Sequence, residues 1–245
     1  MNDPGLAVHL AEVAGRILVE VRKSGIFSPR SLGRAGDNTA NLFLVHALRE
    51  ARPSDAILSE EMKCDGKRLD CSRVWIIDPL DGTREYGEGR DDWAVHVALV
   101  VDGCPVTGAV ALPAIGLVFG SHIPFPLVPC NSPPRMLVSR TRPAAEAVAV
   151  AAAMGAQLVG MGSAGAKAMA VLRGEAEIYL HTGGQYEWDS CAPSAVAQAA
   201  GLHVSRIDGS PLIYNQADAY LPDLLICRPE HAAEVISRAA GAVAR

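Results

Sequence analysis

Two acids follow an apolar run in the segment WIIDPLDGTREYGEG, residues 75–89. Asp78 ends the apolar run, and Asp81 follows three residues later with Pro79 between them. Two carboxylates this close repel each other and resist joint ionisation unless a cation compensates them. Both side chains and an intervening backbone carbonyl can converge on a hard ion, and oxygen ligands favour Mg²⁺, Mn²⁺ or Ca²⁺ over zinc or copper. The pattern therefore predicts a divalent-metal site, with a solvated Asp-Pro and Asp-Gly turn as the alternative.

Other acids stand at the ends of predicted elements. Glu60 and Glu61 close the apolar stretch AILSEE, and Asp189 lies just before a helical pattern. Taken singly, the glutamates read as a solvated strand end and Asp189 as a helix N-cap. Taken together with Asp78 and Asp81, they are acids at several element ends that one site can gather.

The hexapeptide GMGSAG, residues 160–165, matches the GxGxxG fingerprint of dinucleotide-binding proteins, between a predicted strand and a predicted helix. The fingerprint requires an acid about 20 residues further on, at the end of the next strand. That strand, AEIYLH, ends in His181, and the nearby acids Glu175 and Glu177 come too early. We therefore disfavour a nicotinamide oxidoreductase.

Two segments can instead hold phosphate. Gly82 lets a ligand approach the backbone, and the amides that follow it can face an anion. Residues 160–165 are either a tight strand-to-helix turn or a helix start whose amides, with Ser163 and Lys167, hold an anionic group. The sequence leaves this choice open, and it excludes a P-loop because the lysine does not directly follow the last glycine.

Side chains for covalent catalysis have no evident partners. The seven histidines are dispersed, and His96 alternates with apolar residues, so we interpret it as a packed or solvent-facing residue rather than a ligand. Ser72 and Ser121 lack a partner base. The six cysteines form no CxxC pair, which predicts free thiols in a reducing cytoplasm and no zinc site.

The composition predicts a globular protein, with 49% hydrophobic residues and 20% charged residues in a chain of 245. A net charge of −5 offers no basic stripe for DNA or RNA, so a nucleic-acid polymer is not an expected partner. A small phosphorylated ligand remains compatible, because a metal ion can supply positive charge. The N-terminal pattern contains acids, and prolines or glycines interrupt the uncharged stretches 103–134 and 147–166. We therefore expect a cytoplasmic protein without membrane contact.

Hydrophobic periodicity predicts helices followed by antiparallel strands in the N-terminal half, an α+β arrangement. One helix presents Leu6, Leu10, Val13, Ile17 and Val21 on a single face, and a second begins at Asp37. Strands are expected at AILSEE, VWIID, 93–101, 106–112 and 115–119, with a turn at Asp102-Gly103.

The proline-rich segment 124–134 is the predicted boundary between two domains. We expect an N-terminal metal-binding α+β domain at 1–130 and a C-terminal α/β domain at 131–245 that completes the active site. In this second half, predicted strands (MLVS, QLVG, AEIYLH, LHVS and 224–227) alternate with predicted helices (143–154, 164–172, 190–200 and 229–240).

Three motifs, WIIDPLDGTRE, the upstream SEE and the downstream WDSCAPSAVAQAAG, resemble the inositol monophosphatase superfamily in order and spacing. The likeness covers nearly the whole chain. Within the superfamily the chain looks most like the bacterial 3′(2′),5′-bisphosphate nucleotidases, from Arg84-Glu85-Tyr86 after DGT and from the segments VSRTRP, GSAGAK and DGSPLIYN. The resemblance implies a layered α-β-α-β-α sandwich of the sugar-phosphatase type, with an antiparallel sheet in the N-terminal half.

The resemblance also implies roles for individual residues. Up to three Mg²⁺ ions would be held by Glu60, Asp78, Asp81, Asp189 and the carbonyl of Leu80. Thr83 and Glu60 would orient the attacking water, and Asp37 would be a further acid beside them. The substrate would contact Asp81, Gly82, Thr83, Arg84, Ser139, Thr141, Ser163, Lys167 and Asp189, with Glu85 and Tyr86 lining the site more loosely. Two residues depart from the family pattern: Arg34 stands where threonine is usual, and Arg142 where the nucleotidases carry histidine.

The activity implied is hydrolysis of the 3′-phosphate of adenosine 3′,5′-bisphosphate to AMP and phosphate by direct attack of a metal-activated water. Acceptance of the sulfated nucleotide, a role in sulfur assimilation, sensitivity to Li⁺ and a homodimer are further implications. The alternatives are an inositol 1-phosphate or fructose 1,6-bisphosphate phosphatase, which shares the metal site, and a non-catalytic nucleotide sensor.

Overall fold

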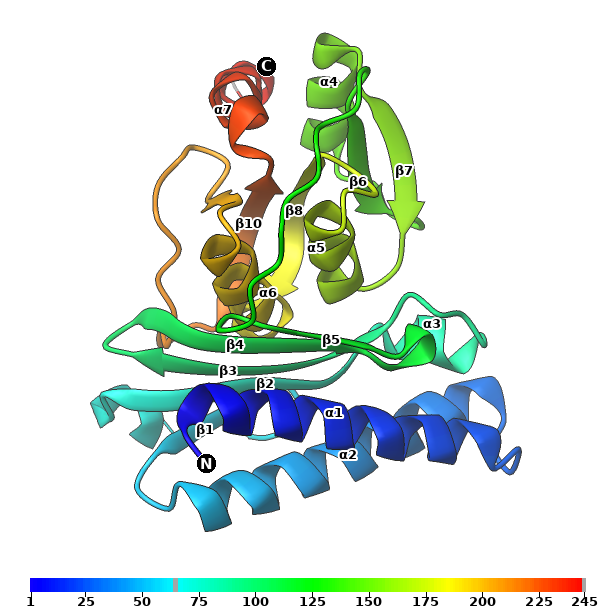
Figure 1. Cartoon of the computed structure of the whole chain (residues 1–245), viewed down its shortest axis with the longest axis vertical. Helices are drawn as coiled ribbons and strands as arrows, with labels where there is room; N and C mark the ends of the chain where they lie inside the picture. The colour runs from blue at the N-terminus through cyan, green and yellow to red at the C-terminus, as the bar shows by residue number, and fades with distance from the viewer. Residues whose placement is uncertain (64–65, 244–245) are drawn as a thin grey trace.

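The computed structural model describes residues 1–63 and 66–243, which stack as alternating layers of helices and sheets (Figure 1). The helices of these layers are α1 (Asp3–Lys23), α2 (Pro29–Ala51), α4 (Ala145–Met154), α5 (Ala164–Leu172), α6 (Glu187–Ala199) and α7 (Pro229–Val243). Helices α1 and α2 cover one face of a first sheet, and α5 and α6 fill the space between this sheet and a second one. Helices α4 and α7 cover the outer face of the second sheet. The predicted five-layered sandwich is confirmed.

The two sheets have different strand patterns. The first contains β1 (Ala56–Ser59), β2 (Arg73–Asp81), β3 (Ala94–Val101), β4 (Cys104–Leu112) and β5 (Leu117–Gly120) in that order. The second has the order β7-β6-β8-β10-β9, with β6 (Arg135–Ser139), β7 (Gln157–Met161), β8 (Ile178–Tyr186), β9 (His203–Ser205) and β10 (Tyr220–Cys227). Strands β1 and β2 are parallel, and the other pairs of the first sheet are antiparallel. In the second sheet β6 runs parallel to β7 and β8, whereas β10 is antiparallel to β8 and β9.

Short elements complete the chain. They are the helix α3 (Thr83–Gly87) and the 3-10 turns η1 (Lys67–Asp70) and η2 (Pro113–Ile115). The predicted turn between β3 and β4 is present, with φ of 49° at Asp102 and 80° at Gly103. Two consecutive left-handed residues suit the twist of a tight hairpin.

Alternation along β2 decides which side chains face the candidate site. Trp75 and Ile77 pack in the core under α1 and α2, whereas Val74 and Ile76 pack in the core formed with α5 and α6. Because successive strand residues point to opposite faces, Asp78 continues the second series. The strand therefore carries its first acid toward α5 and α6.

Helix α1 is confirmed, but its buried face differs from the predicted one. Val13, Ile17 and Val21 are half-buried, whereas small residues such as Ala7, Ala11 and Ala14 join the core beside the leucines. The helix packs closely on its neighbours, since a Cβ on Gly15 would lie 2.6 Å from Pro113 Cγ. A face drawn from large apolar residues alone is therefore rotated from the real one.

Helix α2 begins eight residues before the predicted start at Asp37. Ser28 is its N-cap residue and Pro29 its first residue, a position where the fixed φ of proline suits a helix. Gly33 and Gly36 weaken the helical pattern in the sequence, because glycine has a low helix propensity. In the structure they allow close packing, since a Cβ at Gly33 would lie 2.7 Å from Thr83 Cγ2. Asp37 is consequently a buried mid-helix residue rather than a helix start.

The segment 124–134 contains no helix or strand and links the two sheets. The core between the sheets takes residues from both halves, including Val110 and Leu137, so the division into domains at residue 130 stays a prediction. Cys64 lies outside the described residues, and the other five cysteines are free thiols. Within the described residues, no helix has the length and apolar character that crossing a membrane requires.

Candidate metal and active site

Asp78 and Asp81 reach the same side of β2 because the strand contains a bulge. In a regular strand, residues three apart point to opposite faces. Asp78 pairs with His96 on β3. Asp81 pairs with Ala94, so three steps along β2 match two steps along β3. The extra residue turns Asp81 back toward α5 and α6, and Pro79 is tolerated because a bulge leaves one residue outside the ladder.

The first turn of α5 holds the carboxylate of Asp81. The Ala164 N–H donates to Oδ1 at 3.2 Å, and the Gly165 N–H donates to Oδ2 at 2.7 Å. His96 Nε2 lies 3.2 Å from Oδ2 as an ion pair, off the line of a directed hydrogen bond. Burial by itself raises the pKa of Asp81, but His96 and the Gly165 amide outweigh it and lower the pKa below its usual value. Asp81 is therefore held in its ionised form.

Glycines in the segment 160–165 make this approach possible. A Cβ on Gly165 would collide with His96 Nε2, and a Cβ on Gly162 would lie 2.7 Å from Asp92 O. The Gly162 N–H also donates to Asp92 Oδ2 at 2.6 Å. The anionic group at this helix start is thus the side chain of Asp81, and the resemblance to a dinucleotide fingerprint comes from packing.

Asp189 reaches the site from α6. The helix begins at Glu187 after the N-cap residue Tyr186, so Asp189 is its third residue. Its Oδ2 accepts the Tyr186 N–H at 2.7 Å, and one of its carboxylate oxygens lies within 4.8 Å of those of Asp78 and Asp81. The alternative that Asp189 is the N-cap residue is wrong, because β8 extends through Tyr186 directly into the helix.

Asp78, Asp81 and Asp189 form a compact cluster in which one carboxylate oxygen of each lies within 4.8 Å of the others. Burial, then the negative charges of Glu60 and Asp81, raise the pKa of Asp78 well above its usual value. Burial and Asp81 likewise raise the pKa of Asp189 to about 7. A hard divalent cation fits this cluster, because every donor is a carboxylate oxygen and the repulsion among them is what such a cation relieves.

Glu60 and Asp37 form a second acidic group beside this cluster. Glu60 follows β1 and is open to solvent on one side, yet the surrounding protein and the charges of Asp189 and Asp81 raise its pKa to about 7. Asp37 is buried on α2, where burial and the carboxylates of Glu61 and Glu60 raise its pKa to about 8. Its Oδ1 has no hydrogen-bond partner among the described residues. Both predicted acids therefore lie within the electrostatic field of the site, although Glu60 is not part of the compact cluster.

Thr83 lies at the start of α3, where its hydroxyl donates to the Leu80 carbonyl at 3.1 Å. Gly82 precedes it with φ 88° and ψ 44°, a left-handed conformation that favours glycine. A Cβ on Gly82 would also lie 3.0 Å from Ser163 Cβ. The predicted residues at the end of β2 are thus packed closely against the start of α5.

Ser163 and Lys167 are engaged within the protein. Ser163 is the N-cap residue of α5, and its Oγ accepts the Ala166 N–H at 2.9 Å. Lys167 is buried, its Nζ donates to the carbonyls of Gly162 and Ser163, and it lies 5.1 Å from the centroid of the Tyr179 ring. Burial lowers the pKa of Lys167 to about 8. A contact of either side chain with a nucleotide stays a prediction.

The other predicted substrate residues lie at the rim. Arg84 is exposed on α3, and Thr141 is exposed after β6. Ser139 is half-buried at the end of β6, where its Oγ accepts the Arg142 N–H at 3.2 Å. Arg34 is exposed on α2, one helical turn before Asp37. Among the described residues none of these side chains hydrogen-bonds to the three clustered acids, so their roles also stay predictions.

Glu85 and Tyr86 make structural contacts. The Arg140 Nε donates to Glu85 Oε1 at 2.7 Å and so joins α3 to the end of β6. The Tyr86 hydroxyl donates to the Leu18 carbonyl at 2.7 Å, and its ring meets Trp93 edge-on at 4.9 Å. Tyr86 thus belongs to the core under α1 and α2, and neither side chain hydrogen-bonds to the clustered acids.

His96 is a site residue that the sequence did not identify. It is fully buried, its Nδ1 lies 3.0 Å from the Trp188 carbonyl, and its Nε2 faces Asp81. Burial alone lowers the pKa of His96, but the charge of Asp81 outweighs it and raises the pKa above its usual value. The only sequence signal was its position opposite Asp78 in the pairing of β2 with β3, which depends on where the bulge lies.

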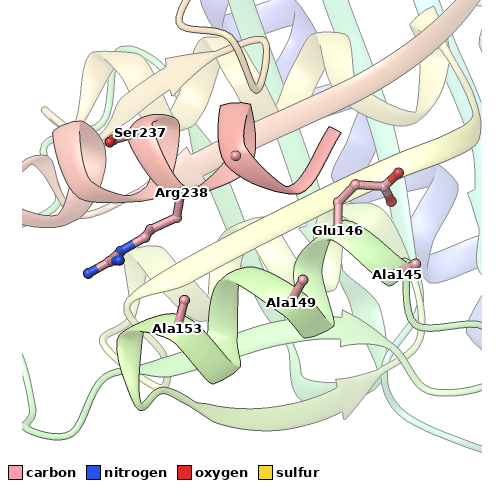
Figure 2. Close-up of a pocket in the computed structure, with 7 residues that line it drawn as sticks. Ala145, Glu146, Ala149, Ala153, Ser237 and Arg238 are labelled. Carbon is pink, nitrogen blue, oxygen red and sulfur yellow. The ribbon is translucent and has the colours of Figure 1, made fainter. Parts of the chain in front are cut away.

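A hollow of 540 Å³ lies between α4 and α7, in the outermost helical layer rather than at the acids (Figure 2). Its walls are mostly small residues, with Glu146 and Arg238 as the charged ones (Figure 2). Glu146 already accepts a hydrogen bond from Thr182 Oγ1 at 2.6 Å. We assign this hollow no part in the candidate site.

The inositol monophosphatase family model matches residues 9–123 and 129–243, and the chain belongs to this family. Among curated proteins, the 3′-phosphoadenosine 5′-phosphate phosphatase of Mycobacterium leprae is 49% identical over 245 aligned positions, which cover 94% of this chain and 90% of that protein. The 3′(2′),5′-bisphosphate nucleotidase CysQ of Escherichia coli (strain K12) is 30% identical and covers 76% of this chain and 81% of its own length.

A solved structure agrees with this assignment at the level of the fold. The crystal structure of CysQ from Bacteroides thetaiotaomicron, a bacterial member of the inositol monophosphatase family, matches with a TM-score of 0.79 at 24% identity. The match covers 92% of this chain and 97% of that one. The match with the family model and the 49% identical relative confirm the family that the three sequence motifs predicted.

Proposed function

We propose that this chain is a Mg²⁺-dependent phosphatase that hydrolyses the 3′-phosphate of adenosine 3′,5′-bisphosphate to AMP and phosphate. The observation that carries the proposal is the convergence of Asp78, Asp81 and Asp189 from two separate elements into one buried cluster. The substrate class follows from the 49% identical relative, which is named for this activity.

In this proposal, Asp78, Asp81 and Asp189 would hold Mg²⁺, and Glu60 and the Leu80 carbonyl would complete the ligand set for up to three ions. When bound, Mg²⁺ supplies positive charge to the phosphoryl oxygens and activates water. Asp81 is ready for this role because α5 and His96 keep it ionised and in place.

The chain's own groups can orient the water. Glu60 offers a carboxylate beside the cluster, and a carboxylate in this position can accept a proton from water. The Thr83 hydroxyl donates its hydrogen bond to the Leu80 carbonyl, so its oxygen can accept a hydrogen bond from water. Asp37 is protonated at neutral pH in the metal-free protein, because burial and the charges of Glu61 and Glu60 raise its pKa to about 8, and its carboxyl group can therefore donate a hydrogen bond. Water would thus attack phosphorus directly, without a phosphoenzyme.

A phosphate-release assay tests the proposal. Adenosine 3′,5′-bisphosphate, inositol 1-phosphate and fructose 1,6-bisphosphate are compared at equal Mg²⁺ concentration, with Asp78→Asn as the blank. We expect the nucleotide to be the preferred substrate, and no release without a divalent cation. Cleavage of inositol 1-phosphate with none of the nucleotide would contradict the substrate assignment, and tight nucleotide binding without turnover of any ester would favour a sensor.

Finer points extend the proposal on the strength of the family's motifs. They are a cytoplasmic location, a homodimer, acceptance of the sulfated nucleotide and inhibition by Li⁺. Light scattering at several protein concentrations checks the dimer, and a Li⁺ titration of phosphate release checks the inhibition.

A further inference from the structure

A series of hydrogen bonds connects Arg68, Asn215 and Glu187 beside the candidate site. Arg68, in η1, donates from its guanidinium to Asn215 Oδ1 and to the Gln216 carbonyl, both at 2.6 Å. Asn215 Nδ2 donates in return to the Arg68 carbonyl at 3.1 Å. The backbone N–H groups of Asn215 and Gln216 each donate to the Glu187 carboxylate at 2.7 Å. We call Arg68, Asn215 and Glu187 the clamp.

The two ends of the clamp belong to segments that carry acids of the candidate site. Arg68 lies in the connection between β1 and β2, which begins with Glu60. Glu187 is the first residue of α6 and precedes Asp189 by two positions. After burial, the charge of Asp189 is the strongest influence that raises the pKa of Glu60, so these two carboxylates lie within each other's field. The clamp therefore connects the two segments that bring Glu60 and Asp189 together.

Both charged members of the clamp are buried. Arg68 is 4% exposed and Glu187 is 1% exposed. Buried charged groups are costly unless directed hydrogen bonds satisfy them, which is what Asn215 and its neighbour do for both. The Glu187 N–H donates in turn to the Ala219 carbonyl at 2.8 Å, so the segment 215–219 is held at the start of α6. The clamp is thus a fixed internal connection rather than a surface contact.

The backbone of Asn215 makes its double contact possible. Its φ is 61°, in the left-handed region that favours glycine, and Asp102 is the other non-glycine residue with positive φ in the described part of the chain. In this conformation the N–H groups of residues 215 and 216 face Glu187, while the side chain of Asn215 faces Arg68. Such conformations cost free energy and are concentrated at functional sites. Glycine would suit this backbone as well, so what the asparagine side chain adds is its contact with Arg68.

Arg68 connects the segment that follows Glu60 to the part of the protein around α6. The strand before Glu60, β1, has only four residues and lies at the edge of the first sheet. Between Gly66 and Cys71 the backbone bonds are local, since the Leu69 N–H donates to the Gly66 carbonyl and the Cys71 N–H to the Arg68 carbonyl. Loss of the Asn215 side chain would therefore give this segment, and Glu60 with it, more freedom relative to α6.

We propose that the clamp positions Glu60: it holds the connection between β1 and β2 against the start of α6, so that Glu60 can join the cation site of the clustered acids. This inference deepens the proposed function and rests on it. Arg68 and Asn215 are positioning residues, because among the described residues neither hydrogen-bonds to the clustered acids. Groups that orient a metal ligand are worth about 10–100-fold in metal affinity, and we expect the lower value because Glu60 is one of several ligands.

Binding of Mn²⁺, used as a probe for Mg²⁺, tests the role of the Asn215 side chain. Asn215→Gly keeps the left-handed backbone and both N–H donors to Glu187, and it removes the contacts with Arg68. Electron paramagnetic resonance of free Mn²⁺ is expected to show an affinity about 10-fold weaker than that of the unaltered protein. Asp102→Gly is the matched control, because it replaces the other left-handed residue, and it should bind Mn²⁺ normally. Unchanged affinity in Asn215→Gly would mean that Glu60 is positioned without the clamp.

A double-mutant cycle separates positioning from a general loss of stability. Glu60→Gln removes the ligand through which the clamp is proposed to act. In that background, Asn215→Gly should weaken Mn²⁺ binding by less than about 2-fold further. A merely structural role would lower the affinity by the same factor with and without Glu60, and that result would overturn the inference.

Hydrogen exchange reports on the segment itself and needs no cation. In the metal-free protein, the amides of Leu69 and Cys71 are expected to exchange about 10-fold faster in Asn215→Gly than in the unaltered protein. The amide of Gly165 in α5, which donates to Asp81, is expected to keep its rate. An equal increase at Gly165 would show that the variant loosens the whole site, which contradicts a specific effect on the segment of Glu60.

Arg68 provides a second pair of variants if Asn215→Gly does not fold. Arg68→Lys keeps a charged donor and should retain most of the Mn²⁺ affinity, whereas Arg68→Met should lower it about 10-fold, and only where Glu60 is present. Equal affinities in the two variants would overturn the inference. Because none of these measurements needs turnover, an unaltered protein that binds Mn²⁺ but releases no phosphate from the nucleotide counts against the proposed function alone.

Discussion

The acids of the candidate site fall into two groups with opposite electrostatics. Asp81 is surrounded by two amides of α5 and by His96, and its pKa is lowered. Asp78 lies on the same strand face and is equally buried, but its strongest charged neighbours are Glu60 and Asp81, and its pKa is raised. The fold therefore supplies the counter-charge for one carboxylate and leaves the other to be compensated by a bound cation.

The largest expected effect is on activity. Asp78 and Asp81 differ in pKa, but both are proposed Mg²⁺ ligands, so the loss of either should have a similar effect. Asp78→Asn and Asp81→Asn each remove a proposed Mg²⁺ ligand, and each is expected to lower phosphate release more than about 100-fold, since even an outer partner of a metal ligand is worth about 10–100-fold. Initial rates at saturating Mg²⁺ measure this. Activity of Asp81→Asn within a few-fold of the unaltered protein would show that Asp81 is purely structural.

A smaller effect is expected from His96, which acts by positioning Asp81. His96→Phe keeps an aromatic ring but removes both polar contacts, so we expect binding of Mn²⁺, used as a probe for Mg²⁺, to weaken about 10–100-fold. Electron paramagnetic resonance of free Mn²⁺ measures this without turnover. Ser194→Ala on α6, which removes a buried hydroxyl bonded to Tyr214, is the matched control and should bind Mn²⁺ normally. Unchanged Mn²⁺ affinity in His96→Phe would mean that α5 alone positions Asp81.

Stability of the metal-free protein should separate the two acids by sign. Asp81→Asn weakens two hydrogen bonds to a charged acceptor and leaves His96 without its partner, so we expect a loss of about 1.5–3 kcal/mol in the free energy of unfolding. Asp78→Asn keeps an oxygen that can accept the Leu80 N–H and removes a carboxyl group whose ionised form Glu60 and Asp81 repel, so we expect unfolding to become less favourable. Urea denaturation in the presence of a chelator measures both changes. If both variants changed the free energy of unfolding in the same direction, Asp78 and Asp81 would not differ in the way proposed.

The smallest expected effect is a pH dependence. The pKa values of Glu60 and Asp189 are raised to about 7 and that of Asp37 to about 8. A carboxyl group with a raised folded-state pKa binds more protons folded than unfolded, so its contribution is full below about pH 4 and is lost as the pH rises toward 8. Metal-free stability is therefore expected to fall between pH 5 and 8.

Two comparisons sharpen this pH test. Saturating Mg²⁺ should flatten the decline, because the cation replaces the protons as counter-charge, and Asp37→Asn should reduce the slope above pH 7. Metal-free stability that rises steadily from pH 5 to 8 would show that these acids are not crowded in the folded protein.

Sequence patterns predicted much of the fold and of the acid set, and the misses have local causes. The existence of each strand, the β3–β4 turn and the family were predicted correctly from alternation and motif order. Two details were wrong: β1 pairs with β2 in parallel rather than antiparallel, and β8 continues past His181 to Tyr186. The predicted start of helix α2 is too late, because Gly33 and Gly36 weaken the hydrophobic pattern of its first turns. In the structure these two glycines allow close packing. The interpretation of His96 as a packed or solvent-facing residue misses its contact with Asp81, because the sequence does not show the bulge in the pairing of β2 with β3.

The order of the residues establishes which groups are available: carboxylates at the ends of strands, glycines where two segments pack closely, and the motifs that define the family. Only the tertiary structure decided which carboxylate is compensated, because that depends on where the amides of α5 and the ring of His96 point. Charge interactions fall off with distance and strengthen with burial, and neither quantity can be read from positions along the chain.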